Sequence, residues 1–376
     1  MKINVKNTLK LNNDGLIVLI STLLLSIIGV FMIYSSSNIW ANFLYNDEFY
    51  YFKRQLIFFI LGLFVIYIFY KIDVNFLYKY INLFELVGII LLILVLIPGI
   101  GIVKNGSQSW FGIGSLSFQP AELFKIISIL YVSKHLGDNY KNNKKIKDLL
   151  LSLIMPLLGF LLILIQPDFG SGIVMISAIV IMSMMSKVKF KNFIYLGLLG
   201  VGAIVVMIIS EPYRIDRIIA YIDPFSDPLG SGFQIIQSLY ALGPGGILGS
   251  GVNNSIQKHF YLPEPQTDFI FAIIAEEYGL IGSLLIIILF GLLFYFGFSI
   301  SKKQNEYKLS LLSIGIVSLI GVQVVINLGV VVGLLPVTGI TLPFISYGGS
   351  SLLILDIGIG ILLNLSKEKI DESISC

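Results

Sequence analysis

Long apolar runs constrain this chain more than any other feature of its sequence. A helix needs about 20 predominantly apolar residues to cross a bilayer, and ten segments of the 376-residue sequence approach or exceed that length. They cover residues 16–37, 55–70, 81–98, 119–136, 149–166, 169–186, 193–210, 268–300, 309–330 and 348–365. We therefore predict an all-α membrane protein with about ten transmembrane helices, folded as a single polytopic domain over residues 1–376.

Composition supports this class and excludes several others. Hydrophobic residues make up 56% of the chain and charged residues only 12%, whereas soluble domains carry about 25% charged residues. The net charge of +3 is too small to indicate nucleic-acid binding. Cys376 is the only cysteine, and His135 and His259 lie far apart, so the sequence contains no metal-ligand spacing. The glycine-rich segment at 243–251 lacks the GK[ST] ending of a P-loop, so we expect no nucleotide or organic cofactor.

Lysines and arginines between the apolar runs indicate an orientation. Most of the 25 lie near the two termini and in alternate loops, at 71–80, 134–148, 187–191 and 302–308. Because cytoplasmic loops are enriched in these residues, we predict that both termini are cytoplasmic. The loop at 211–267, between the seventh and eighth helices, is then the largest extracytoplasmic segment.

All three arginines fall on the predicted outer side. Arg214 and Arg217 are three residues apart, so one helical turn would direct both guanidinium groups the same way. Such a pair suits a phosphate or pyrophosphate. Anchoring at the membrane interface is an alternative of equal weight.

Asp268 directly precedes an apolar helix in the stretch "PEPQTDFIFAIIAEE". A helix N-terminus favours a carboxylate, so helix capping is the simple explanation. Ala272, Ala275 and Gly279 lie within about 40° of the same helix face. This stripe of small residues would let another helix approach closely beneath the acid.

Further charged residues fall within predicted helices or at their ends. Glu122 and Lys125 are on one helix face and form either a structural ion pair or part of a polar cavity. Glu276 and Glu277 lie two turns below Asp268, where an acid either serves a function or is paired.

Two outer-face residues each have a simple explanation beside a functional one. Asp168 is in the turn "QPDFGSG", where Pro and Gly already account for the turn. Trp110 could stack on a sugar ring or belong to the interfacial aromatic belt.

Five motifs, taken together, resemble the SEDS family of bacterial cell-wall proteins, the FtsW, RodA and SpoVE type. The resemblance covers about residues 100 to 365, and two of the motifs, "QSLYALGPGGILG" and "PVTGITLPFISYGGSS", are closer to the FtsW and SpoVE branches. The motifs are "NGSQSWFGIGSLSFQPAELFKI", "QPDFGSG", "YRIDRIIAYIDPFSDPLGSGFQIIQSLYALGPGGILGSG", "FYLPEPQTDFIFAIIAEEYG" and "LLPVTGITLPFISYGGSS".

The resemblance implies ten spans and a peptidoglycan glycosyltransferase in the bacterial cytoplasmic membrane. Such an enzyme polymerises lipid II on the outer face, in cell division or sporulation, beside a class B penicillin-binding protein, which is a transpeptidase. Asp268 matches the essential aspartate of the family. Glu122, Lys125 and Trp110 match its other motif positions.

The implied reaction is consistent with these residues. The donor is an α-linked pyrophosphate and the product is β-linked, so a single inverting displacement needs one base, and Asp268 can serve. The leaving pyrophosphate needs positive charge, for which the candidates are Arg214, Arg217, Lys258 and a divalent cation, Mg²⁺ or Mn²⁺. No metal ligand is assigned. We also predict that Asp168 and Glu264 contribute to substrate binding, and they are the next candidates for the base.

Two other functions stay open. A lipid II flippase would use the buried charges as a polar pathway, although the sequence contains no obvious inverted repeat of broken helices. A non-catalytic scaffold for a transpeptidase would not need Asp268 at all.

Overall fold

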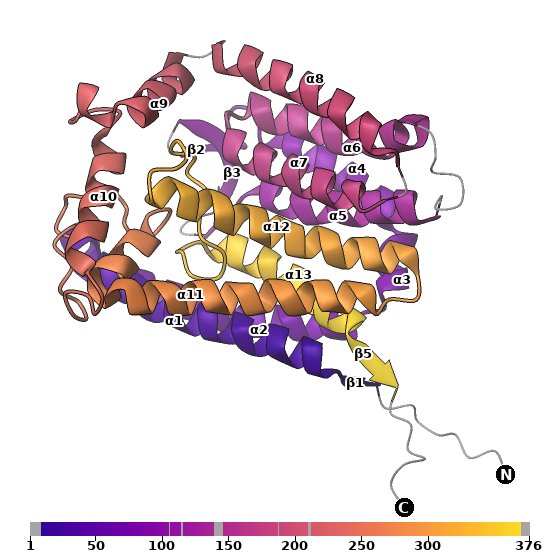
Figure 1. Cartoon of the computed structure of the whole chain (residues 1–376), viewed down its shortest axis with the longest axis horizontal. Coiled ribbons are helices and arrows are strands. Elements are labelled where there is room, and N and C mark those ends of the chain that lie inside the picture. The colour runs from indigo at the N-terminus through magenta and orange to yellow at the C-terminus, as the bar shows by residue number, and fades with distance from the viewer. Residues whose placement is uncertain are drawn as a thin grey trace, which may run out of the picture.

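The structure is a computed structural model that describes residues 9–104, 106–113, 116–138, 146–186, 188–209 and 212–369. Its long helices run side by side along the longest axis (Figure 1). Each of the ten predicted segments overlaps one helix. These helices are α1 (Asn13–Tyr45), α2 (Tyr50–Lys71), α4 (Ile81–Leu94), α5 (Pro120–Asp138), α6 (Ile146–Ile165), α7 (Phe169–Met184), α8 (Phe190–Ile209), α11 (Ile270–Lys302), α12 (Tyr307–Val331) and α13 (Gly349–Leu365).

Length and hydropathy identify this bundle as that of a multi-pass membrane protein. Among the described residues, α1, α2, α11 and α12 are long and apolar enough to cross a membrane, while α4, α7, α13 and the Leu149–Ile165 part of α6 are shorter and apolar. Helix α2 exposes large side chains such as Phe64, of which 62% is accessible. Lipid would cover such a surface, because water-exposed apolar patches of this size are rare.

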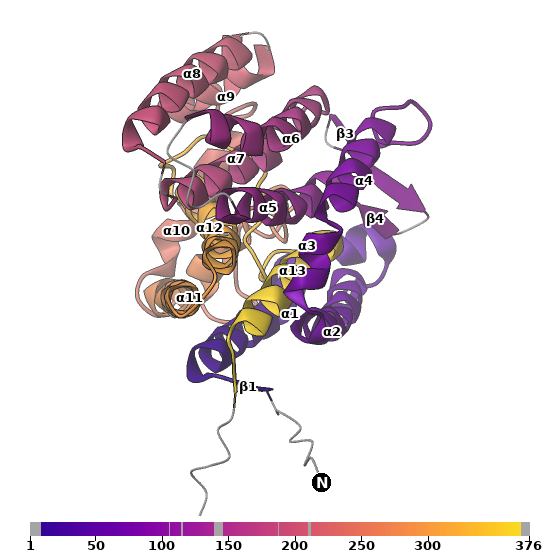
Figure 2. The ribbon, with the colours of Figure 1, turned by 90° about the vertical axis from the view of Figure 1, so that its right-hand side faces the viewer.

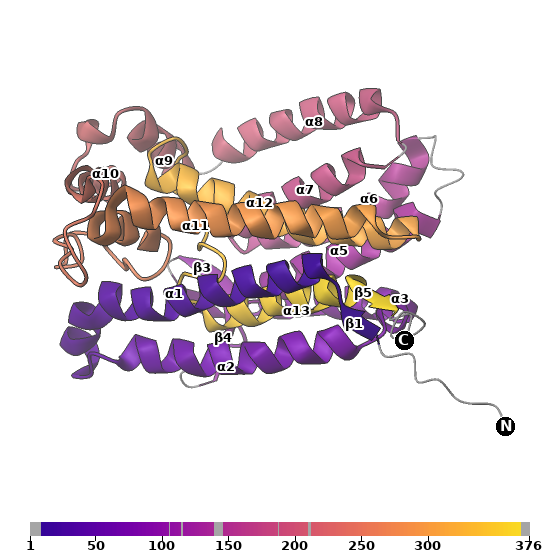
Figure 3. The same cartoon turned by 60° about the horizontal axis from the view of Figure 1, so that its bottom comes forward.

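The helices pack in a regular arrangement around α12. Helix α12 contacts α5, α7 and α11, while α2 lies along α13 and α1 along α11. Viewed nearly along its axis, α12 lies near the centre (Figure 2). Helices α1, α2 and α13 form one side of the bundle, and α8 lies at the opposite edge (Figure 3). Phe124, Phe290 and Leu312 are among the fully buried core side chains.

Two small sheets add to the predicted all-α fold. Strands β2 (Ile102–Lys104), β3 (Ser107–Ile113) and β4 (Leu116–Phe118) form an antiparallel sheet between α4 and α5. Strands β1 (Leu9–Leu11) and β5 (Lys367–Lys369) pair antiparallel, so the two described chain ends lie together. This pairing agrees with termini on one side of the membrane. Which side that is stays a prediction.

The predicted outer loop at 211–267 is ordered over most of its length. It contains α9 (Pro212–Ile222), the 3₁₀ turn η1 (Pro224–Ser226) and α10 (Phe233–Gly245), followed by irregular backbone up to α11. In Figure 1, α9 and α10 lie at the end of the bundle opposite β1 and β5. A short helix, α3 (Val74–Lys79), connects α2 to α4.

Candidate active site

A cavity of about 1390 Å³ collects most of the predicted site residues. Its walls come from the β2–β4 sheet, the start of α5, the α6–α7 turn, α9 and the segments that flank α11 and α13. Of the nine residues predicted for the site, seven line the cavity: Trp110, Glu122, Lys125, Asp168, Arg217, Glu264 and Asp268. Lys258 is not among the lining residues, and the side chain of Arg214 lies outside the described part of the structure.

Asp268 lies in this wall without capping the helix that follows it. Helix α11 begins at Ile270, its N-cap residue is Phe269, and no side chain caps it. The hydroxyl of Thr267 donates to Asp268 Oδ1 at 2.8 Å. The Asn327 side chain donates to the Asp268 carbonyl oxygen at 2.7 Å. The capping explanation is therefore wrong, and the carboxylate belongs to the cavity.

The surroundings of Asp268 favour its action as a base. Burial raises the pKa of Asp268 above its ordinary value, while the Thr267 hydrogen bond and the positive charge of Arg217 oppose this rise. A carboxylate with a raised pKa accepts a proton more readily than an ordinary one, provided that it is ionised at the working pH.

Asp168 both caps a helix and lines the cavity. Its Oδ1 accepts from the backbone N–H of Ser171 at 3.2 Å, which caps α7, and its Oδ2 accepts from Gln119 Nε2 at 2.6 Å. Burial raises the pKa of Asp168, and the negative charge of Glu122 adds to the rise. Because hydrogen bonds engage both of its oxygens, Asp168 is held in place more firmly than a mobile base would be.

Glu122 and Lys125 form the ion pair that their spacing predicts. Lys125 Nζ lies 2.6 Å from Glu122 Oε1, and both side chains are almost fully buried. Ser351, at the start of α13, donates to Glu122 Oε2 at 3.1 Å. The pair thus joins α5 to α13 within the cavity wall, so the structural and cavity explanations both hold.

Trp110 lies on β3, beside a lysine that the sequence did not single out. Lys104 Nζ is 4.7 Å from the centre of the Trp110 ring, and both residues line the cavity. Burial lowers the pKa of Lys104, as does the charge of Arg54, whereas Glu264 opposes the shift. The sequence could have indicated Lys104 as a site residue, because this lysine lies in the same predicted outer segment as Trp110.

Arg217 reaches the cavity from α9. Its Nη1 donates to the Val337 carbonyl oxygen at 2.9 Å. Because the side chain of Arg214 lies outside the described part of the structure, the expectation that both arginines point the same way stays a prediction. Glu264 also lines the cavity and has a φ of 43°, which is an uncommon backbone conformation for a residue other than glycine. Tyr51 and Tyr347 complete this side, with ring centres 4.9 Å apart.

Lys258 lies elsewhere, buried behind the cavity. Its ammonium is 3.3 Å from Glu277 Oε1 and donates to the Asn253 carbonyl oxygen at 2.7 Å. Burial lowers the pKa of Lys258, while the charge of Glu277 opposes that shift. The prediction that Lys258 contacts the leaving group therefore finds no support in its position.

The cavity carries several carboxylates, but they do not form a metal cluster. Within the described residues, no three side chains of His, Cys, Asp or Glu are grouped closely enough to hold a metal ion. A divalent cation in this cavity would therefore depend on one or two carboxylates together with oxygens of the substrate.

The bundle and its cavity define a multi-pass membrane protein with a large cavity lined by charged residues. A model of the cell cycle protein family that includes FtsW, RodA and SpoVE matches residues 16–371. The chain therefore belongs to this family, which confirms the resemblance of its motifs.

Individual relatives agree with this assignment over nearly the whole chain. Stage V sporulation protein E of Bacillus subtilis is 46% identical over 365 residues, which cover 96% of this chain and 99% of that protein. A probable peptidoglycan glycosyltransferase FtsW of Coxiella burnetii is 39% identical over 370 residues, covering 96% of this chain and 98% of that protein. Both belong to the branches that the motifs favoured.

Two solved structures have the same fold. A chain from a solved peptidoglycan synthase complex, described as showing the structural coordination of polymerization and crosslinking, superposes with a TM-score of 0.75 at 30% identity, covering 93% of this chain and 96% of that one. The rod shape determining protein RodA of Thermus thermophilus has a TM-score of 0.70 at 25% identity, covering 93% of this chain and 95% of that one.

Proposed function

We propose that the protein is a peptidoglycan glycosyltransferase that polymerises lipid II on the outer face of the cytoplasmic membrane. The observation that carries the proposal is the position of Asp268. Its carboxylate lies in a large charged cavity and does not cap α11. The names of the FtsW relatives and the family membership support the same activity.

The proposed reaction is a single inverting displacement. Asp268 takes the proton from the acceptor hydroxyl, whose oxygen then attacks the anomeric carbon of the donor sugar. The bond between that carbon and the pyrophosphate oxygen breaks, and the pyrophosphate leaves with the electron pair. This needs one base, unlike glycoside hydrolysis, which uses two carboxylates.

We assign stabilisation of the pyrophosphate to basic side chains in the cavity. Arg217 and Lys104 line it and present positive charge, which stabilises the negative charge that develops on the leaving group. Trp110, beside Lys104, offers a ring on which a sugar could stack. A divalent cation that binds together with the pyrophosphate is the alternative source of charge, and removal of metal by a chelator would distinguish the two.

We further propose that a class B penicillin-binding protein is the partner of this chain. The solved structure that this chain resembles is a peptidoglycan synthase complex in which polymerisation and crosslinking are coordinated. That coordination supports a paired arrangement of the two activities here.

The test is lipid II polymerisation by the purified protein with its transpeptidase, read as glycan chains on a gel. We expect Asp268→Asn to lose at least about a hundredfold in rate, the usual range for removal of a general base. Asp14→Asn is the matched control. Like Asp268, Asp14 accepts a hydrogen bond from a hydroxyl, that of Ser299, but it pairs with Lys303 at 2.8 Å and lies near β1 at the other end of the bundle.

Each rival function gives a different result. Equal rates from wild type and Asp268→Asn would remove the base assignment and leave Asp168 and Glu264 as candidates. No chains from wild type, with donor and partner shown to be competent, would favour the flippase or the scaffold.

A further inference from the structure

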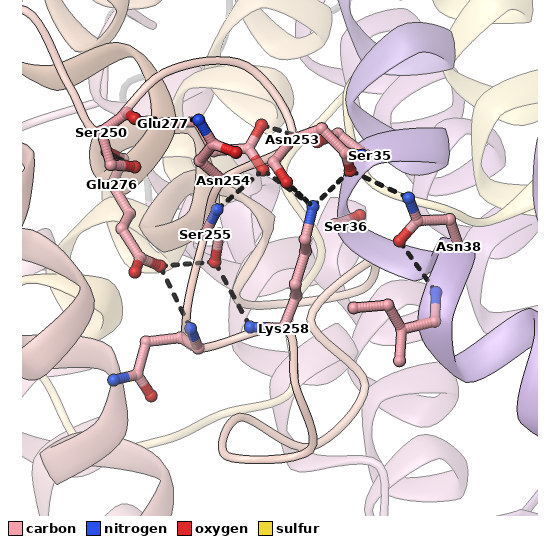
Figure 4. Close-up of polar contacts among 12 residues, drawn as sticks. Ser35, Ser36, Asn38, Ser250, Asn253, Asn254, Ser255, Lys258, Glu276 and Glu277 are labelled. Atoms are coloured by element: carbon pink, nitrogen blue, oxygen red, sulfur yellow. Dashed lines mark hydrogen bonds and ion pairs between the residues drawn. The ribbon is translucent and has the colours of Figure 1, made fainter.

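A buried polar cluster behind the cavity joins three segments that are far apart in sequence. It connects α1, the loop from residue 250 to 262, and the first part of α11 (Figure 4). Its members are Ser35, Asn38, Asn253, Ser255, Lys258, Glu276 and Glu277. None of these residues lines the cavity as the structure describes it.

Glu276 holds the tip of the loop. Its carboxylate accepts from the Ser255 hydroxyl at 2.5 Å and from the backbone N–H groups of Ile256 at 2.8 Å and Gln257 at 3.4 Å. Backbone N–H groups that are buried in this way need an acceptor. The carboxylate therefore fixes the turn from residue 255 to 257.

Glu277 links the loop to α1. Ser35 on α1 donates to Glu277 Oε2 at 2.6 Å, while Lys258 Nζ lies 3.3 Å from Glu277 Oε1. Both charged side chains are at most 1% exposed. Lys258 also donates to the side chain of Asn253, whose Oδ1 accepts from Asn38 on α1 at 2.9 Å.

The backbone at the start of this loop and at the end of α10 fills a break in α11. At Gly279 the helix has a φ of 61° and a ψ of −154°, so its regular hydrogen bonds are interrupted. Ser250 N donates to the Glu276 carbonyl oxygen at 2.9 Å, and Leu280 N donates to the Gly246 carbonyl oxygen at 3.0 Å. Freed backbone groups at membrane depth need such partners. The loop and the first part of α11 thus form one unit.

This unit also carries Asp268. The chain runs from Lys258 through Leu262, which is fully buried and donates its N–H to the Gln257 carbonyl oxygen at 2.9 Å. Phe260 packs against Trp40 of α1, with ring centres 4.7 Å apart. At the far end, Asn327 of α12 holds the Asp268 carbonyl. Between these ends, Tyr347 N donates to the Gln266 carbonyl oxygen at 2.8 Å and the Ser346 hydroxyl donates to the Thr267 carbonyl oxygen at 2.5 Å. The cluster is therefore the anchor at the start of the Asp268 segment, while α12 and the segment before α13 hold its end.

We propose that Lys258 and Glu277 are positioning residues, which tie the 250–262 loop to α1 and α11 and so hold Asp268 in the cavity. The proposal rests on the proposed polymerase function. A buried ion pair is a costly way to stabilise a fold, since an apolar pair of similar volume is often at least as stable. Its directional hydrogen bonds to three segments instead specify one loop geometry.

Hydrogen–deuterium exchange of the purified full chain tests the tether without any substrate. We expect Glu277→Gln to speed amide exchange in the loop at 253–262 by about tenfold or more, because a local tether sets the opening free energy of the segment. The double variant Lys258→Met, Glu277→Gln removes both charges and should exchange more slowly than either single variant. Asp14→Asn, which breaks an ion pair near the opposite end, should leave the loop unchanged.

Polymerisation kinetics test the positioning role. For Glu277→Gln we expect kcat to fall by about tenfold or more, with KM for lipid II changed less than about threefold, because a positioning defect affects the reacting geometry rather than substrate binding. The double variant lacks the same hydrogen bonds and should therefore not recover the lost kcat, even where removal of both charges restores stability. If Glu277→Gln does not fold, Ser35→Ala removes only one neutral donor to Glu277 and should lower kcat by about threefold.

The outcomes separate this inference from the proposed function. Unchanged exchange in Glu277→Gln would disprove the tether, and faster exchange with kcat within about twofold would disprove positioning. A large rise in KM with kcat unchanged would instead mean that the cluster contacts substrate. Failure of the proposed function appears differently, as a wild-type protein that makes no glycan at all.

Discussion

Carboxylates that look alike in the sequence have different surroundings in the structure. Asp168 uses one oxygen as a helix cap and the other to accept from Gln119, Glu122 is neutralised by Lys125, and Asp268 faces the cavity with a single described side-chain donor, Thr267. The last arrangement engages the carboxylate least among these three, which supports our proposal that Asp268 is the base. The choice of base is therefore a matter of local hydrogen bonding.

The raised pKa of Asp268 predicts a trade-off between activity and stability. Because burial raises the folded-state pKa above 3.8, the ionised form costs folding free energy, and stability falls as pH rises through the raised pKa. We expect Asp268→Asn, which is neutral and similar in shape, to have a higher thermal midpoint than wild type at pH 8. The gain should shrink as pH falls towards 3.8, as measured by thermal unfolding in detergent. A lower midpoint at pH 8 would contradict this explanation.

The Glu122–Lys125 pair predicts a double-mutant pattern. Removing one partner leaves an uncompensated buried charge, so Glu122→Gln or Lys125→Met alone should destabilise the protein by about 3–5 kcal/mol. The double variant should recover much of that loss, because it removes both charges. Thermal midpoints of the three variants measure the coupling. Asp47→Asn is the control, since its pair with Lys53 is exposed and should be dispensable. If the double variant loses as much stability as the two single variants together, Glu122 and Lys125 are not energetically coupled.

At the scale of elements, α11 departs most from its sequence pattern. Its apolar run predicts one continuous helix from residue 268, yet the helix begins at Ile270 and is broken at Gly279. The small-residue stripe did predict a close approach, because a Cβ atom added at Gly245 of α10 would collide with the Ala275 carbonyl oxygen. The β2–β4 sheet was missed, because its strands of three to seven residues are too short for a clear alternation of apolar and polar residues.

The break in α11 predicts a position-specific glycine requirement. Gly279→Ala would place a Cβ atom 2.5 Å from Gly249 N in a backbone conformation that favours glycine, so we expect folded yield and thermal midpoint to fall. Gly291→Ala is the control in the same helix. No atom lies within 4 Å of its added Cβ, and alanine should stabilise a regular helix by about 0.5–1 kcal/mol. Equal effects at both positions would disprove a special role for the break.

At the scale of the whole molecule, the two ends of the helix bundle differ: one holds the described chain ends, and the other holds α9 and α10. The strands β1 and β5 bring the described chain ends together, whereas α9 and α10 lie at the opposite end (Figure 1). Residues of α9 line the cavity. A polymerase of lipid-linked sugars on the outer face requires the cavity end to be outside, in agreement with the distribution of lysines and arginines.

This arrangement predicts an accessibility pattern for single cysteines. Cys376 is the only native cysteine, and a membrane-impermeant maleimide added to intact spheroplasts should not label it. Leu229 is 88% exposed beyond α9, so Leu229→Cys in a Cys376→Ser background should be labelled under the same conditions. Permeabilised cells are the control, because there both sites should react. The reverse pattern would invert the orientation and place the cavity in the cytoplasm.

The sequence alone determined the class of protein and the positions of ten helices, and seven of its nine predicted site residues line the cavity. Apolar length and lysine distribution are local properties, and the motifs around Trp110, Glu122 and Asp268 are short enough to read directly. Tertiary structure alone decided that Asp268 does not cap a helix, that Lys258 pairs with Glu277 away from the cavity, and that α11 breaks at Gly279. These outcomes depend on contacts between segments far apart in the chain, such as Ser35 with Glu277, and such contacts leave no periodic signal in either segment.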